Sequence, residues 1–171
     1  MGTSGRPDRI VTVKRVIAAA PELIFDVLAS PAHHHRIDGS GMLRGEPRGP
    51  ERLTMGSKFT LAMKQGVAGY RSLNRVVEFD ENRAICWETY GEVFGRRFVG
   101  GQHWRYELVP IAGADGPAAV STLVLHSYDW GAAMMAPVLQ LLGYPRRMAA
   151  ATPKSLRQLD SAVVLGPEVG A

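Results

Sequence analysis

The strongest constraint on the fold is a series of short alternating segments between Phe59 and Tyr128. In the first of them, Phe59, Leu61 and Met63 alternate with small or polar residues, as in a β-strand with one buried face. Similar segments span residues 70–79, 83–90, 97–109 and 119–128, separated by turns and by loops predicted at residues 91–95 and 110–117. Such a succession predicts an antiparallel sheet in which each strand pairs with the next.

Helical patterns lie on both sides of these strands. A β-branched strand over residues 9–17 precedes Pro21, which suits the first turn of a short helix ending at Ala29. Ser30-Pro31 ends that helix and begins a second, which reaches about Arg36. Residues 39–56 are rich in glycine and proline and predict a loop with one short edge strand around residues 42–44.

The C-terminal third predicts helix. Residues 131–142 are apolar, and Gly143-Tyr144-Pro145 interrupts them before a longer helix from Arg146. In that helix, apolar or small residues recur at helical spacing: Met148, Thr152, Leu156, Leu159 and Val163. The order of elements predicts an α+β fold, in which a curved antiparallel sheet of about six or seven strands wraps around the long C-terminal helix.

A curved sheet and one helix leave unfilled volume between them, so this fold predicts an internal apolar pocket. The candidate ligand-binding residues are those that we expect on the concave strand faces: Phe59, Leu61, Met63, Trp87, Gln102, Trp104, Tyr106, His126 and Tyr128. The last strand leaves two options. His126 and Tyr128 share one face with Val124, whereas Leu123 and Leu125 lie on the other, and alternation does not say which face is concave.

The opening IVTVKRVIAAAPELIFDVLASPAHH resembles the start of the START-like, helix-grip (SRPBCC) superfamily. The segments GGQHWRYELVP and HSYDW and the C-terminal helix extend the resemblance over about residues 9–163, toward the bacterial polyketide cyclase/dehydrase and lipid-transport families. It implies a lipid, polyketide or aromatic ligand but no single activity. Many members carry a tryptophan shortly after the second helix. Arg36-Ile37-Asp38 occupies that region here, so no role of that tryptophan is transferred.

The polar pocket candidates leave catalysis open. His126, Tyr106, Tyr128 and Gln102 among apolar walls can polarise a carbonyl group or move a proton, or they can simply orient a ligand. No catalytic residue is identified by the pattern. Arg75 alternates with Leu73 and is expected to face solvent, since a buried arginine needs an anionic partner.

Two further features have structural interpretations. His33, His34 and His35 with Asp38 form the densest group of metal-ligand residue types, but consecutive residues on a helix point about 100° apart. Only His34 and Asp38 share a face, so we expect no metal site, with one histidine turned inward. Cys86 lies within a strand and is expected to be a small buried residue.

Composition narrows the partners. The net charge is +4, but the 20 lysines and arginines are dispersed, so nucleic-acid binding is not expected. No apolar run is long enough to span a membrane, and one cysteine fits a reducing compartment, so we expect a cytoplasmic protein. We also expect no cofactor. Residues 9–165 are expected to form one domain between flexible segments at residues 1–8 and 166–171.

Three functions follow as alternatives. The first is binding of a small hydrophobic ligand, favoured by a purely apolar pocket. The second is a polyketide cyclase/dehydrase-like enzyme, favoured if Tyr106 or His126 is exposed to the pocket. The third is a protein-interaction module, such as a homodimer formed through the apolar segment 134–142. We also expect the glycine-rich segment 39–56 to be long enough to act as a lid.

Overall fold

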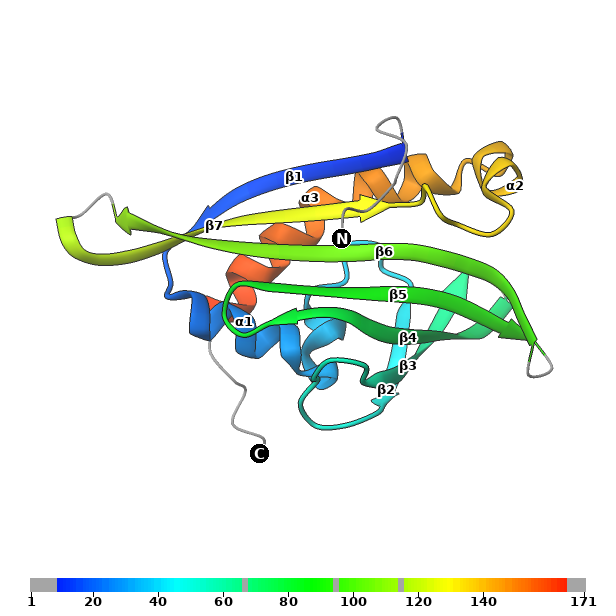
Figure 1. Ribbon diagram of the computed structural model, residues 1–171, viewed down its shortest axis with the longest axis horizontal. Coiled ribbons are helices and arrows are strands. Elements are labelled where there is room, and N and C mark those ends of the chain that lie inside the picture. Colours follow the sequence, from blue (N-terminus) through cyan, green and yellow to red (C-terminus); the bar gives the residue numbers. More distant parts are fainter. Residues whose placement is uncertain (1–8, 66–67, 94–95, 114–115, 166–171) are drawn as a thin grey trace.

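A seven-stranded antiparallel sheet and a long C-terminal helix dominate the fold (Figure 1). The computed structural model of the protein describes residues 9–65, 68–93, 96–113 and 116–165, so the segments at 1–8 and 166–171 lie outside the described residues. The strands are β1 (Ile10–Ile17), β2 (Leu43–Arg48), β3 (Lys58–Gln65), β4 (Ala68–Asp80), β5 (Ala84–Val93), β6 (Arg96–Gly113) and β7 (Gly116–Asp129). The helices are α1 (Pro21–Ala29), the 3-10 helix η2 (Pro31–Arg36), α2 (Ala136–Leu141) and α3 (Tyr144–Val164).

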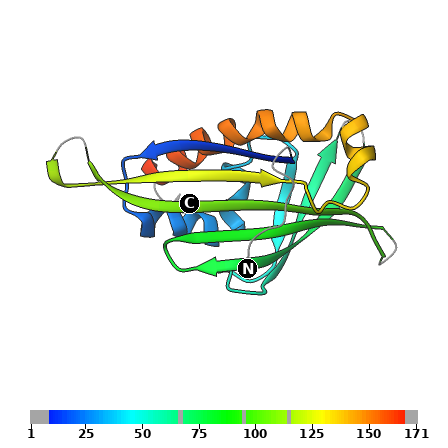
Figure 2. The same cartoon turned by 45° about the horizontal axis from the view of Figure 1, so that its top comes forward.

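The strand order is β1-β7-β6-β5-β4-β3-β2, so β2 to β7 form a meander and β1 closes the sheet beside β7. Helix α3 lies along one face of the sheet and packs against β1, β7 and α1 (Figure 2). The predicted α+β arrangement, with a sheet around one C-terminal helix, is therefore confirmed. None of the described helices is both long and apolar enough to cross a membrane.

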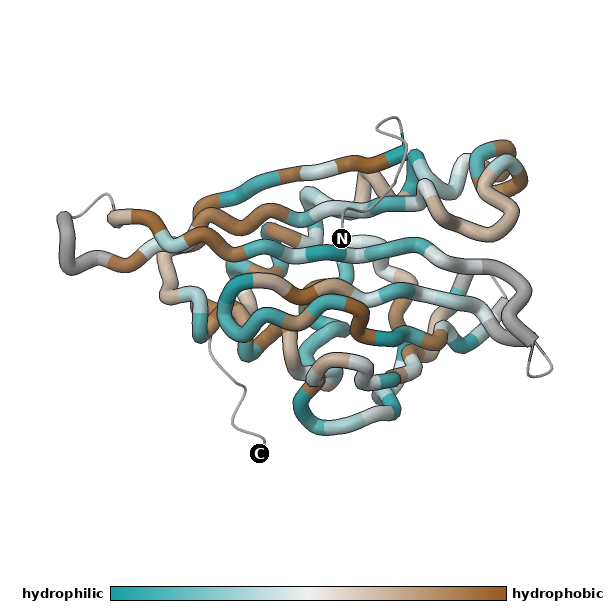
Figure 3. Tube along the Cα trace, in the orientation of Figure 1, coloured by the Kyte–Doolittle hydropathy of each residue, from teal (hydrophilic) through white to brown (hydrophobic). Residues whose placement is uncertain are grey.

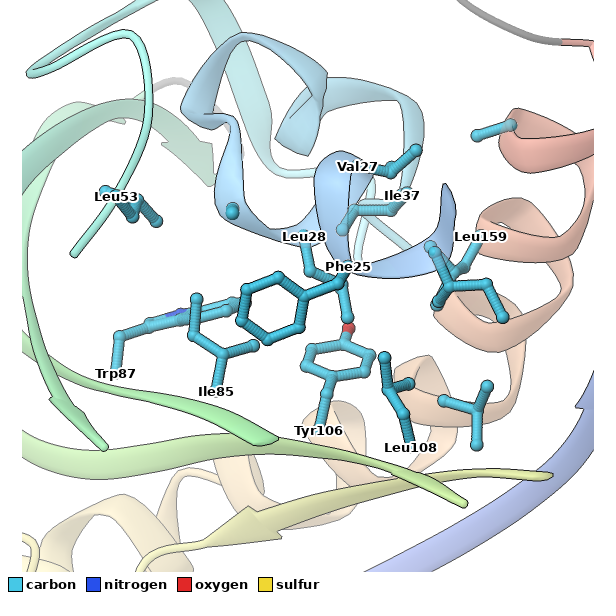
Figure 4. Close-up of a cluster of buried hydrophobic side chains, with 14 of the residues drawn as sticks. Phe25, Val27, Leu28, Ile37, Leu53, Ile85, Trp87, Tyr106, Leu108 and Leu159 are labelled. Carbon is cyan, nitrogen blue, oxygen red and sulfur yellow. The ribbon is translucent and has the colours of Figure 1, made fainter. Parts of the chain in front are cut away.

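Helix α1 shows why this region was predictable from sequence. Pro21 has a fixed φ that suits the first turn, and the helix spans the predicted residues. Ile24, Phe25 and Leu28 recur at helical spacing and are completely buried. In Figure 4, Phe25 reaches from α1 into the space between Ile85 and Tyr106 of the sheet. The main core therefore lies between α1, α3 and the inward face of the sheet.

The predicted loops at residues 91–95 and 110–117 are wrong in extent, because β5, β6 and β7 continue through most of them. Pro110 lies within β6, where it pairs with Thr122 of β7. Two residues before Pro110, the N–H of Leu108 points toward β5 and donates to the carbonyl oxygen of Arg83, which directly precedes that strand. Pro110 has the same orientation but lies beyond the end of β5, so its missing N–H removes no sheet hydrogen bond.

The β6–β7 hairpin consequently extends past the other strands, at the left of Figure 1. Hydrophobic residues are frequent where it runs beside β1 (Figure 3). The loop at residues 39–56 also holds more strand than predicted, since β2 reaches Arg48.

The predicted helix over residues 131–142 is also shorter than expected. Only Ala136–Leu141 is helical, because Met134 joins the sheet through a bridge to Gly100. Helix α3 begins at Tyr144 rather than Arg146, since Pro145 lies in the first turn, where no N–H is needed. Gly143 separates the two helices with a φ of 67°, a left-handed conformation that glycine adopts without a steric penalty.

Candidate functional site

A cavity of about 100 Å³ lies between the inward face of the sheet and α3. Strands β3 to β7 form one wall, and the segment from η2 to β2, together with α3, forms the other. The lining residues are His34, Ile37, Asp38, Ser40, Leu43, Leu61, Met63, Ser72, Asn74, Trp87, Thr89, Trp104, Tyr106, His126, Tyr144, Met148, Ala151 and Ser155. The predicted position of a pocket between sheet and helix agrees with this cavity.

Six of the nine candidate ligand-binding residues line the cavity: Leu61, Met63, Trp87, Trp104, Tyr106 and His126. The other three are buried beside it. Phe59 packs edge to face against His34, with ring centroids 5.2 Å apart. Tyr128 packs on Trp104 at 4.5 Å, and Gln102 is buried. Their places in the core support the walls of the cavity.

The inward face of β7 is the one that carries His126. Thr122, Val124, His126 and Tyr128 are buried, whereas Leu123, Leu125 and Ser127 are partly exposed. The strand alternation left this choice open, and packing against the helices decides it. His126 and Tyr106 are directly paired across β7 and β6, so both side chains point to the same side of the sheet.

A row of stacked rings forms the sheet wall. The ring centroids of Trp87 and Tyr106 are 5.7 Å apart, and those of Tyr106 and His126 are 4.0 Å apart with an angle of 8° between the planes. Trp104 also stacks on His126, with its ring centroid 6.1 Å from that of His126. Stacked in this way, the rings cover one another's faces and turn their edges toward the cavity.

His126 has a defined orientation and protonation state. It is only 1% exposed, and its Nδ1 lies 3.3 Å from the carbonyl oxygen of Arg105. Since a carbonyl only accepts, Nδ1 carries the proton and Nε2 keeps its lone pair. Nε2 is at the end of the ring away from the backbone, so it points from the sheet toward the interior. Burial lowers the pKa of His126 to about 4, although the Arg105 carbonyl opposes this shift.

His34 is the inward-facing histidine of the cluster at residues 33–35. Its Nε2 donates to the carbonyl of Leu28 at 2.9 Å, and its ring stacks on Trp87 at 5.0 Å. Burial lowers the pKa of His34 to about 4. His35 is exposed. Across the described residues, no three His, Cys, Asp or Glu side chains converge to hold a metal ion.

A polar group on β4 and β5 was not predicted. The Thr89 hydroxyl donates to Asn74 Oδ1 at 2.7 Å, and Asn74 Nδ2 donates to Ser72 Oγ at 3.3 Å. Ser72 and Asn74 are buried although polar, and the neighbouring charged Arg75 is exposed, as expected. The available signal was that Arg71 and Arg75 share the strand face opposite to Ser72 and Asn74, so arginines that face solvent place these two residues inward.

The segment after η2 closes the opposite wall. The carboxylate of Asp38 accepts hydrogen bonds from the backbone N–H of Ser40 at 2.9 Å and of Leu43 at 2.8 Å, and from the Ser40 hydroxyl at 2.5 Å. The N–H of Gly39 donates to Ser155 Oγ of α3 at 3.0 Å. Asp38 therefore orders the loop that packs against α3 and closes this side of the cavity.

The remaining titratable lining groups are tyrosines. Burial raises the pKa of Tyr106 and of Tyr144 well above the ordinary value, and Asp38 adds to both shifts. Figure 4 shows Tyr106 pointing from β6 toward the helices, with its hydroxyl at the far end.

Cys86 is buried, as predicted, with its pKa raised by burial to about 12, so its thiol is unreactive at neutral pH.

No protein-family model matches the chain. Two uncharacterized proteins of Mycobacterium tuberculosis, Rv0088 and MT0096, are 32% and 31% identical to it over 127 and 128 residues. Each match covers 74% of this chain and 50% of the relative. The chain therefore spans about half the length of the curated relatives it matches.

Solved structures resemble the chain in fold rather than sequence. A protein from Arthrobacter aurescens has a TM-score of 0.68 at 11% identity, and the match covers 93% of this chain and 88% of that one. Protein Ms6760 from Mycobacterium smegmatis has a TM-score of 0.65 at 15% identity, with 96% and 98% covered. A truncated norcoclaurine synthase from Thalictrum flavum has a TM-score of 0.62 at 12% identity, with 92% and 94% covered. These likenesses support the helix-grip fold.

Proposed function

We propose that the protein binds a small apolar ligand in the cavity between the sheet and α3. The observation that carries this proposal is the cavity itself, enclosed by aromatic side chains on the sheet side and by Met148 and Ala151 on the helix side. Concave apolar sites with a few placed polar groups are the usual form of small-molecule sites. The fold neighbours support a ligand-binding scaffold, and membership of the START-like superfamily is part of the proposal.

Native mass spectrometry of the freshly purified protein tests this function and does not require the ligand to be identified in advance. We expect a mass above that of the bare chain, and extraction should release one apolar compound or a narrow chemical class. A bare mass that does not change when small hydrophobic compounds are added would contradict the proposal.

A cavity-filling substitution provides a matched test. Ala151 lines the cavity from α3 and is buried, so Ala151→Leu places three more carbon atoms in the space that a ligand needs. We expect at least a tenfold loss of affinity for a compound identified by extraction. Ala150→Leu is the control, because Ala150 is exposed on the same helix. Equal affinities of the two variants in calorimetric titrations would place the ligand elsewhere.

An acid–base enzyme of the polyketide cyclase/dehydrase kind is the second candidate. It is favoured by Tyr106 and His126, which both line the cavity. The lowered pKa of His126 makes it a weak base at neutral pH, whereas efficient proton transfer needs a pKa near the working pH. Binding therefore ranks first. Conversion of the extracted compound by wild-type protein, abolished in His126→Gln, would reverse this order.

A protein-interaction module is the third candidate. Around α2, several large apolar side chains are exposed: Met134, Met135, Val138, Leu141 and Leu142. Leu141 is 87% exposed, so this surface is suited to contact with a second copy of the chain. The same native mass spectra test it, since a homodimer appears at twice the mass of the chain and should be lost in Leu141→Glu.

A further inference from the structure

We propose that the ligand is an uncharged molecule with one planar ring and a hydroxyl or N–H group that donates a hydrogen bond to Nε2 of His126. This inference rests on the binding function proposed above. It follows from the charge, the shape and the free hydrogen-bonding atoms of the cavity walls.

The walls offer no partner for a charged ligand. None of the described residues that line the cavity is a lysine or an arginine, so a buried anion would have no counter-charge there. Asp38 is the lining carboxylate, and its oxygens already accept three hydrogen bonds from the loop that it organises. His34 and His126 are neutral at pH 7 because burial lowers the pKa of each to about 4.

The shape favours a single ring. A cavity of about 100 Å³ is of the same order as the engineered protein cavity of about 150 Å³ that holds benzene. The stacked rings of Trp87, Trp104 and Tyr106 turn their edges to it, and a planar aromatic ring gains edge-to-face contacts there. Met63 and Met148 also line it, and their flexible side chains allow modest widening.

His126 supplies the specific hydrogen-bond acceptor. Its Nδ1 is held by the Arg105 carbonyl and its ring is held by stacking on Tyr106, so the direction of Nε2 is fixed before a ligand arrives. No hydrogen bond joins Nε2 to any residue that the structure describes. Nε2 is therefore an available acceptor, and a ligand that supplies the donor gains a hydrogen bond there.

Calorimetric titration with simple probes at pH 7.5 tests this ligand class. The probes are p-cresol, which is neutral and carries a donor, 4-methylanisole and toluene, which are neutral without one, and benzoate, which is an anion. We expect p-cresol to bind about tenfold more tightly than the two neutral probes that lack the donor, as one hydrogen bond allows. Benzoate should show no measurable binding.

Substitutions at His126 assign the preference to Nε2. His126→Phe keeps a ring for stacking but removes the acceptor, so p-cresol should lose its tenfold advantage while toluene still binds. His126→Gln retains an acceptor oxygen and should restore part of the preference. The melting temperature of each variant is measured first, and the comparison of p-cresol with 4-methylanisole on the wild-type protein serves if a variant does not fold.

The outcomes separate this inference from the proposed function. Toluene or 4-methylanisole binding as tightly as p-cresol would overturn the role of His126 and leave apolar ligand binding intact. Tighter binding of benzoate would overturn the requirement for an uncharged ligand. If no probe binds, both the inference and the small-ring form of the proposed function fail.

Discussion

Gly39→Ala is expected to destabilise the protein by about 3 kcal/mol, because the added Cβ meets backbone atoms that cannot move aside. A Cβ at this position would lie against the carbonyl oxygen of Ala151 and 2.5 Å from the backbone nitrogen of Ser155. The loop would then have to separate from α3 and lose the hydrogen bond from the Gly39 N–H to Ser155 Oγ. Urea denaturation measures the change as a lower midpoint.

Gly41→Ala in the same loop is the matched control. Gly41 has a φ of 64°, and no atom lies within 4 Å of a Cβ placed there. The cost is therefore limited to backbone strain of about 1 kcal/mol. Gly39 contacts Ser155 and follows Asp38, and both of these residues line the cavity. Gly39→Ala should therefore also weaken ligand binding more than Gly41→Ala. Equal midpoints for the two variants would contradict the close approach of the loop to α3.

Acidification is expected to produce the second large effect, a loss of up to about 3 kcal/mol of stability for each of His34 and His126. Both are neutral and buried in the folded protein, with pKa values of about 4. In the unfolded chain each titrates near its ordinary pKa of 6.5. Between these values the unfolded state binds more protons, so stability falls as the pH is lowered from 6.5 to about 4.

The upper half of this window isolates the histidines, because most carboxylates titrate below pH 5. We expect the free energy of unfolding to fall by about 1.5 kcal/mol per buried histidine between pH 6.5 and 5. His34→Gln and His126→Gln each remove one titrating group and should each reduce this slope. A free energy of unfolding that stays constant over the interval would show that the two side chains are not buried as neutral imidazoles.

Local patterns predicted the elements whose signals lie within the element itself. Pro21 and the spacing of Ile24, Phe25 and Leu28 defined α1, and alternation at Phe59, Leu61 and Met63 defined β3. The loops predicted around residues 91–95 and 110–117 were wrong in extent, because the glycine and proline residues there do not interrupt β5, β6 and β7. Whether Pro110 interrupts a strand depends on which edge its missing N–H faces, and only the pairing partner determines that.

The residues of the cavity walls were only partly predictable, because the elements packed against each strand determine which of its faces is buried. Alternation placed His126 and Tyr128 on one face but could not decide whether that face is concave, since burial of a strand face depends on the helix packed against it. One histidine of the cluster at residues 33–35 was expected to turn inward, but that it is His34 depends on the 3-10 geometry of η2. The approach of Gly39 to α3 depends on a contact with Ser155, more than 100 residues away in sequence. The choice of His34 and the position of Gly39 therefore have no local signal.

The most direct test of the central claim is to locate a ligand in the protein. Crystals soaked with 4-bromophenol, at a concentration that saturates binding in solution, would show the bromine by its anomalous scattering. We expect a peak in the cavity between Trp104 and Met148, with the phenol oxygen within hydrogen-bond distance of His126 Nε2. An empty cavity, with bromine found only on the protein surface, would contradict ligand binding at this site.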